Sequence, residues 1–290
     1  MNKNIHTFIG CDYDYEESDI VIFGAPYDST TSYRPGARFA SAAIRNESYG
    51  LETFSLYQDK DLLDKKVFDA GDLELPFGDP NKPLLLIEQM TTKLLEDGKL
   101  PVMIGGEHLV TLGAVRSVVK KYDNVHILHF DAHADLRHDY LTSTLSHATV
   151  MRRCHELVGD HKIFQFGIRS GDKEEIEWGK MHVDTCRFDF ATLPSLVETL
   201  KSAGVPVYLT IDLDVLDPSI FPGTGTPEAG GVSFLDLLTA LKLVSQLNIV
   251  AADMNELSPT YDMSGASTAL ACKVLRELLL LLENRNSKSD

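Results

Sequence analysis

The chain has 290 residues, and its 27 Lys and Arg against 43 Asp and Glu give a formal net charge of 27 − 43 = −16. Nucleic acids and anionic membranes bind clustered positive charge, so an acidic surplus without a Lys/Arg block disfavours both as partners. Metals or amines are the expected partners instead. With 43% hydrophobic residues the chain can bury a substantial core, which excludes disorder as its main state.

Neither a membrane span nor a secretory leader is expected. The longest apolar stretch, near Leu278 to Leu282, is far shorter than the ~20 residues that a span requires, and the start MNKNIHTF has no apolar signal core. The four cysteines are scattered and never form C-x-x-C, which argues against a disulfide framework or a thiolate zinc site. We therefore expect a soluble, cytoplasmic protein.

Runs of β-branched and apolar residues predict six buried strands, at 19–24, 101–105, 125–130, 162–167, 207–211 and 248–252. Helical patterns lie between them at 107–122 and from about 265 to 282. The clearest helix follows Ser233. The motif Ser233-x-x-Asp236 resembles a capping box, and the apolar residues after it fall on one helical face as far as Leu247. This alternation predicts an α/β fold of three αβα layers, an open and mostly parallel sheet with helices on both faces.

No repeat, low-complexity tract or linker divides the sequence, so we expect a single domain over residues 1–290. The acidic run that precedes the first strand predicts a solvated N-terminal arm at 1–18. The last residues, 283–290, are expected to form a frayed tail.

Acidic residues and histidines follow four of the predicted strands. The four segments are Gly105-Gly-Glu-His108, Asp131-Ala-His-Ala-Asp135, Asp212-Leu-Asp214 and Asp253-Met-Asn-Glu256. Because ligands gather beyond the carboxyl ends of parallel strands, we expect these side chains at one rim of the sheet. His126 and His129 lie inside a strand and are predicted to be core histidines with satisfied hydrogen bonds rather than ligands.

Asp and His without Cys form an oxygen and nitrogen ligand set that suits manganese and related divalent ions. Alternation places Asp131, His133 and Asp135 on one face if the strand continues, and the same holds for Asp212 and Asp214. Burying several carboxylates without a cation costs many kcal/mol, so the alternative is an exposed acidic rim. Nucleotide-binding and G-x-S-x-G nucleophile motifs are missing from the sequence, which disfavours those two chemistries.

The ordered motifs of this chain resemble those of the ureohydrolases, the arginase/agmatinase family. The resemblance spans nearly the whole chain and is specific as a set. It is carried by Gly24-Ala-Pro-Tyr-Asp28, Arg34-Pro-Gly-Ala-Arg38, Gly105–His108, Asp131–Asp135, Ser146-His147, Gly167-Ile-Arg-Ser-Gly171, Thr210–Pro218, Gly223-Thr-Gly-Thr-Pro-Glu228 and Asp253–Pro259.

The resemblance implies a centre of two Mn²⁺ ions per chain. One ion would be held by His108, Asp131, Asp135 and Asp212, and the other by Asp131, His133, Asp212 and Asp214, so that Asp131 and Asp212 bridge the pair. Two divalent ions that share a water lower its pKa and yield hydroxide near neutral pH. A strong nucleophile is required because the guanidinium carbon is resonance-stabilised and a poor electrophile.

The resemblance also implies three residues that act on the substrate. Glu256 would pair with the guanidinium and orient it over the bridging hydroxide, since a carboxylate suits a planar fork of donors. Asp135 would help relay the proton to the departing amine. His147 resembles the family's proton shuttle at the mouth of the site, a role that suits a side chain titrating near neutrality.

The segment from Asp135 to Arg153 is similar to the bacterial agmatinase branch of the family. The implied reaction is hydrolysis of agmatine to putrescine and urea, a step of polyamine biosynthesis. Arginine, guanidinobutyrate, guanidinopropionate and formiminoglutamate are alternative substrates, and their carboxylates would require a basic group such as Arg137 at the end of the pocket. Asp139 is the candidate partner for the far amine of agmatine.

A catalytically silent metal-binding regulator is the alternative from another functional class. Loss of a ligand, of His147 or of Glu256 would favour it, and all of these residues are present. The resemblance further implies a homo-oligomer, a trimer or a hexamer.

Overall fold

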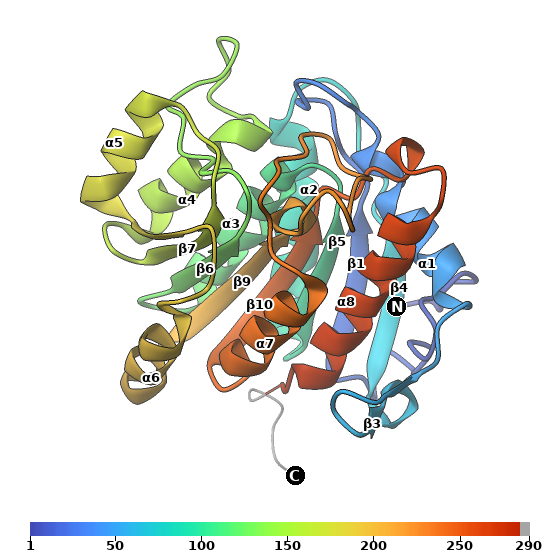
Figure 1. Cartoon of the computed structure of the whole chain (residues 1–290). Helices are drawn as coiled ribbons and strands as arrows, with labels where there is room; N and C mark the ends of the chain where they lie inside the picture. The colour runs from blue at the N-terminus through green and yellow to red at the C-terminus, as the bar shows by residue number, and fades with distance from the viewer. Residues whose placement is uncertain (285–290) are drawn as a thin grey trace.

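A central sheet of eight strands organises the computed structural model, which describes residues 1–284 (Figure 1). Every pairing between neighbouring strands is parallel. In sheet order the strands are β4 (Val67–Asp72), β1 (Ile20–Ala25), β5 (Leu100–Gly105), β10 (Asn248–Asn255), β9 (Pro206–Asp212), β6 (His126–Phe130), β7 (Ile163–Ile168) and β8 (Asp184–Arg187).

All six strands expected from the sequence are present, and the two that were not expected lie at the edges of the sheet. β4 carries Asp69 and Asp72, and β8 is mostly exposed, so neither has the continuous apolar run of a central strand. β10 runs on to Asn255, past the predicted end at 252, because its last polar residues are also buried.

Helices cover both faces of the sheet, which confirms the three-layer αβα prediction (Figure 1). One layer holds α1 (Ala40–Ser48), α6 (Leu193–Ala203), α7 (Phe234–Val244) and α8 (Ala266–Leu281), and the other holds α2 (Asn81–Glu96), α3 (Thr111–Lys121) and α4 (Val150–Val158), with α5 (Lys173–His182) beside β8. Both faces need cover because the side chains of each strand point alternately to opposite faces and both sets are apolar. In β1, Ile20 and Ile22 pack against the first layer, and Val21 and Phe23 pack against the second.

The predicted helices are confirmed close to their expected ends. Ser233 caps α7 in a capping box with Asp236, and Gly265 precedes α8. The remaining elements are short: the antiparallel pair β2 (Phe54–Ser55) and β3 (Lys60–Asp61), and the 3₁₀ turns η1 (Ala37–Phe39), η2 (Leu62–Asp64), η3 (His108–Val110), η4 (His147–Thr149), η5 (Leu213–Val215) and η6 (Pro259–Tyr261).

Both ends of the described chain contact the body of the protein. Within the predicted arm, Phe8 and Cys11 are fully buried, and the Phe8 amide donates to Asp69 Oδ2 at 2.8 Å. Asn284 donates to the carbonyl of Gly98 at 2.7 Å, and residues 285–290 of the predicted tail lie outside the described residues. Within 1–284 no helix has both the length and the apolar character that crossing a bilayer needs.

A buried ion-pair cluster fastens α1 to the edge of the sheet. Arg45 donates from Nε and Nη2 to the two oxygens of Asp69, each at 2.9 Å, and from Nη1 to Asp72. Arg45 and Asp69 are 3% and 1% exposed, so water cannot replace either partner. The two carboxylates raise the pKa of Arg45, against the opposing effect of its burial.

We expect Arg45→Met to lower the free energy of unfolding by about 3–5 kcal/mol, because it leaves the Asp69 carboxylate buried and unpaired. Urea denaturation at neutral pH measures the loss. The matched control is Lys93→Met, which breaks the exposed pair with Asp97 and should cost less than about 1 kcal/mol. Equal losses in the two variants would contradict this account.

Candidate metal centre

The acidic and histidine residues expected at one rim come from the four central strands of the sheet. β5, β10, β9 and β6 are neighbours in that order, so their carboxyl ends meet at one edge. The strands are followed by His108 after β5, Glu256 after β10, Asp212 and Asp214 at the end of β9, and Asp131, His133 and Asp135 after β6.

Gly106 allows the loop after β5 to enter this edge. A Cβ atom on Gly106 would lie 1.9 Å from the carbonyl oxygen of Tyr27, a distance at which backbone would have to move. Because Gly106 lies so close to the backbone of Tyr27, the chain can pass from β5 into η3 within two residues. η3 begins at His108, which is 1% exposed.

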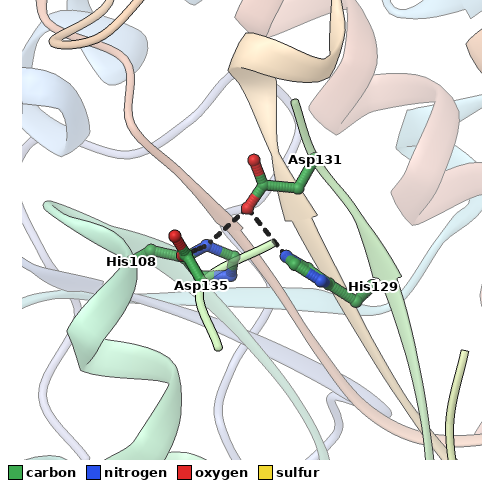
Figure 2. Close-up of side chains that lie close together, drawn as sticks. All are labelled: His108, His129, Asp131 and Asp135. Carbon is green, nitrogen blue, oxygen red and sulfur yellow. Dashed lines mark hydrogen bonds and ion pairs between the residues drawn. The ribbon is translucent and has the colours of Figure 1, made fainter. Parts of the chain in front are cut away.

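His108 presents Nδ1 to three carboxylates. This atom lies 3.1 Å from Asp131 Oδ2, 3.1 Å from Asp135 Oδ2 and 3.4 Å from Asp212 Oδ2. It makes no hydrogen bond of acceptable geometry, although it is buried. The other ring nitrogen, Nε2, lies 2.9 Å from the hydroxyl of Thr210. Nδ1 is left to face the carboxylates, and Figure 2 shows it directed at Asp131.

A second group of ligand atoms shares Asp131 with the first. His133 Nδ1 lies 3.0 Å from Asp214 Oδ2 and 3.5 Å from Asp131 Oδ1. Asp214 Oδ2 is also buried without a hydrogen bond. Asp131 thus directs one oxygen to the His108 group and the other to the His133 group.

Burial and mutual proximity shift the pKa values of the carboxylates in this cluster. Burial, and then the charges of Asp214 and Asp131, raise the pKa of Asp212 well above its ordinary value. Burial and Asp131 raise the pKa of Asp135 to about 7. Burial also opposes ionisation of Asp131, but His129 and His108 outweigh it and hold the pKa of Asp131 well below its usual range.

These residues fit divalent cations. Within 1–284 no Lys or Arg pairs with the four aspartates, and two buried atoms of ligating type, His108 Nδ1 and Asp214 Oδ2, lack hydrogen bonds. Positive charge placed between the carboxylates would relieve their repulsion. The oxygen and imidazole donors match hard to borderline metals.

Two of the predicted site residues hold strained backbone. Asp135 has φ of 53° and Glu256 has φ of 67°, in the left-handed region that non-glycine residues seldom adopt. Such a conformation costs on the order of 1–3 kcal/mol and persists only where the surroundings enforce it. Around Asp135 the enforcing contacts include the amides of Met151 and Arg152, which donate to its carbonyl.

Glu256 lies beside the centre with one oxygen engaged. Oε1 accepts from the amide of His108 at 2.6 Å, and Oε2 faces the loop at Gly225. Burial and the neighbouring Glu107 raise the pKa of Glu256 well above its ordinary value. Glu107 is itself fully buried and accepts from the amide and hydroxyl of Thr30, at 2.9 and 2.6 Å.

His147 lines the open side of the site. It borders a cavity of about 330 Å³ together with His133, Asp135 and Arg137. Its amide donates to the Thr30 hydroxyl at 3.1 Å, which links its position to Glu107. Burial, and then the charge of His133, lower the pKa of His147 to about 4, so the imidazole is neutral at physiological pH.

Several residues that support the centre have no role predicted from the sequence. Glu107 stands within the Gly-Gly-Glu-His motif but had no assigned role, and Thr210 and Asp253 are buried in neighbouring strands. The Thr210 hydroxyl is 2.5 Å from Asp253 Oδ1, so a buried carboxylate supports the group that contacts His108. The available signal for Thr210 was a polar residue inside an apolar run, whereas Asp253 was expected at the rim and instead lies within β10.

The chain is similar to known proteins over most of its length. The Arginase family model matches residues 18–281. The agmatinase of Bacillus subtilis (strain 168) is 48% identical over 279 residues, which cover 94% of this chain and 95% of that protein. A solved structure from Clostridium difficile has a TM-score of 0.91 at 50% identity, covering 94% of this chain and 99% of that one. The agmatine ureohydrolase of Thermoplasma volcanium has a TM-score of 0.88 at 32% identity, covering 99% and 97%.

The chain belongs to the arginase family. The resemblance inferred from the sequence motifs is thereby confirmed. Its closely similar relatives include proteins named as agmatinases.

The loop that carries Gly225 and Thr226 to the site is closed by one aspartate. Asp217 accepts from the amide and hydroxyl of Ser219, at 3.0 and 2.5 Å, and from the amides of Gly230 and Gly231, at 2.9 Å each. These hydrogen bonds, those from Ser219 first, lower the pKa of Asp217 to about 2. Ionised Asp217 therefore stabilises the folded loop.

We expect the stability difference between wild type and Asp217→Asn to depend on pH. Because the folded pKa is depressed, the contribution of Asp217 is fully present above its ordinary pKa of 3.8 and is lost as the pH falls toward about 2. Denaturant unfolding of both proteins across this range measures it. A difference that stays constant down to the lowest pH would show that the charge of Asp217 is not what closes the loop.

Proposed function

We propose that this chain hydrolyses agmatine to putrescine and urea at a centre of two Mn²⁺ ions. The observation that carries the proposal is the pair of ligand groups that share Asp131 and are buried among carboxylates without a Lys or Arg partner within 1–284. The first ion would be held by His108, Asp131, Asp135 and Asp212, and the second by Asp131, His133, Asp212 and Asp214.

Two divalent ions would supply a water that ionises near neutral pH and would stabilise the charge that develops on attack. The residues around them then have to hold the guanidinium in place. Glu256 suits this role, because Oε1 is fixed by the amide of His108 while Oε2 remains directed at the loop of Gly225. The guanidinium would form charge-assisted hydrogen bonds with this carboxylate.

Proton movement is assigned to Asp135 and His147. Asp135 borders both the ligand group and the cavity, so it can pass a proton toward the departing amine. His147 borders the same cavity, so its imidazole can exchange protons between the site and solvent. Its Nε2 lies 3.1 Å from the hydroxyl of Ser32, which orients the ring.

Arg137 favours agmatine over guanidines that carry a carboxylate. It lines the cavity, but Nη1 lies 3.1 Å from Asp172 Oδ2 and Nε lies 3.7 Å from Glu175 Oε1. Asp172 and Glu175 line the same cavity, so two carboxylates accompany one guanidinium there. A wall with this charge balance attracts an ammonium group and repels a carboxylate.

The predicted amine partner, Asp139, has less support. Its carboxylate lies 3.4 Å from His138 Nδ1 and borders an adjacent hollow with Arg152 and Trp178 rather than the cavity of His147. We retain agmatine as substrate because relatives named agmatinases are 48% identical over most of the chain. By the same likeness we propose a cytoplasmic homo-oligomer, a trimer or a hexamer.

We expect the Mn²⁺-loaded protein to release urea from agmatine with a kcat/KM at least about tenfold higher than from arginine or guanidinobutyrate, a difference of about 1.4 kcal/mol. The physical reason is the charge balance around Arg137. Urea release over a series of substrate concentrations measures it. A preference for a carboxylate-bearing guanidine would assign another ureohydrolase activity, and no turnover of any guanidine by metal-loaded protein would favour the silent regulator.

We expect Asp131→Ala to lower bound Mn²⁺ to well under two ions per chain and activity by more than about 100-fold, because both ligand groups lose a shared carboxylate. Metal content after gel filtration and urea release measure the two effects. Asp123→Ala is the matched control, since it removes an exposed carboxylate before the start of β6, at the end of the sheet opposite the centre, and should change neither. Full metal content in Asp131→Ala would remove this aspartate from the ligand set.

A further inference from the structure

His129, in strand β6, contacts Asp131, the aspartate that the two ligand groups share. Its Nε2 lies 2.7 Å from Asp131 Oδ2, and the side chain is fully buried inside β6 (Figure 2). The prediction of a core histidine with satisfied hydrogen bonds agrees with this burial, but its partner is the residue that joins the two ligand groups. Since His129 is also among the residues of the first group that could hold a metal, it could act either as a ligand or as a donor to Asp131.

The neighbouring amide decides between these roles. Gln165 Nε2 lies 2.7 Å from the carbonyl oxygen of Ala134 and 3.0 Å from His129 Nδ1, and Gln165 Oε1 accepts from the Thr185 hydroxyl at 3.0 Å. A carbonyl oxygen can only accept, so the Gln165 atom beside Ala134 must be the NH₂ group. The second hydrogen of that group then points at His129 Nδ1.

This arrangement determines which ring nitrogen of His129 carries the hydrogen. Nδ1 accepts from Gln165, so in the neutral ring the hydrogen resides on Nε2. That hydrogen is donated to Asp131 Oδ2, and a nitrogen that carries it has no lone pair for a metal. Turning the Gln165 amide around would place two carbonyl oxygens 2.7 Å apart, which excludes the other tautomer.

The register of the sheet places the three hydrogen-bonded side chains at adjacent positions on neighbouring strands. Thr185 pairs with Gln165 across β8 and β7, and Gln165 pairs with His129 across β7 and β6. Residues paired in this way in parallel strands point to the same face, so the three side chains form one row that ends at Asp131. His129 and Gln165 are both 0% exposed, so water does not compete for these groups.

We infer that His129, fixed as a donor by Gln165 and Thr185, is a positioning residue that orients Asp131 for the metal centre. The inference rests on the proposed function, since Asp131 must be a ligand for its orientation to affect metal binding. Asp131 Oδ1 is similarly held by the amide of His133 at 2.5 Å, so each oxygen of the carboxylate has a donor. Partners of this kind behind metal ligands commonly govern affinity by about 10–100-fold.

The test is Mn²⁺ binding to metal-free protein, measured by calorimetry for wild type, His129→Leu, His129→Gln and Gln165→Met. We expect two ions per chain in every protein at saturation. His129→Leu should raise the Kd by about 10–100-fold. His129→Gln, whose amide can place a donor near the original Nε2, should recover most of that loss, and Gln165→Met should show a smaller increase because it frees the imidazole to change tautomer.

Two controls separate this role from a loss of folding or of function. His126→Leu removes a half-exposed histidine from the same strand and should bind Mn²⁺ as wild type does, and the unfolding midpoints of the metal-free proteins report the folded state. An unchanged Kd in His129→Leu overturns the inference, as does a stoichiometry of one ion, which would make His129 a ligand. Failure of the wild type to bind Mn²⁺ would instead overturn the proposed function.

Discussion

Repulsion among buried carboxylates is the constraint on which the rest of this structure depends. Asp131, Asp135, Asp212 and Asp214 are all 6% exposed or less, and burial, followed by the charge of neighbouring aspartates, raises the pKa of Asp212 and Asp135. Isolated charges in such a place would be strongly destabilising. Divalent ions bound between the carboxylates would remove this repulsion, so the residues that destabilise the metal-free protein suit a metal centre.

The sheet supplies the rigidity that this arrangement needs. One row of paired residues crosses five adjacent strands beneath the centre, from Asp253 through Thr210, His129 and Gln165 to Thr185. Toward one side the row reaches His108 through the Thr210 hydroxyl, and toward the other it reaches Asp131 through His129. A polar layer inside an otherwise apolar sheet therefore orients two residues from the loops above it. Flexible surface loops alone could not hold them within hydrogen-bond distance.

The fold and the rim of the site were predictable because both rest on local patterns. Apolar runs identified the six inner strands, and the Asp and His residues immediately after four of them identified the edge where the site lies. The edge strands β4 and β8 escaped prediction because Asp69, Asp72 and exposed positions break their apolar runs. Pairings across the sheet, such as Gln165 with His129, depend on strand order and register, which no local pattern encodes. Arg137 could be named from the sequence, but its pairing with Asp172 required the tertiary structure.

In the proposed centre, Asp131 lies between two manganese ions. The most direct test is a crystal structure of the Mn²⁺-loaded protein with anomalous scattering recorded at the manganese edge. We expect two anomalous peaks, one on the His108 side of Asp131 and one on the His133 side, with His129 donating to Asp131 and contacting neither ion. A single peak, or a peak bound directly to His129, would contradict it.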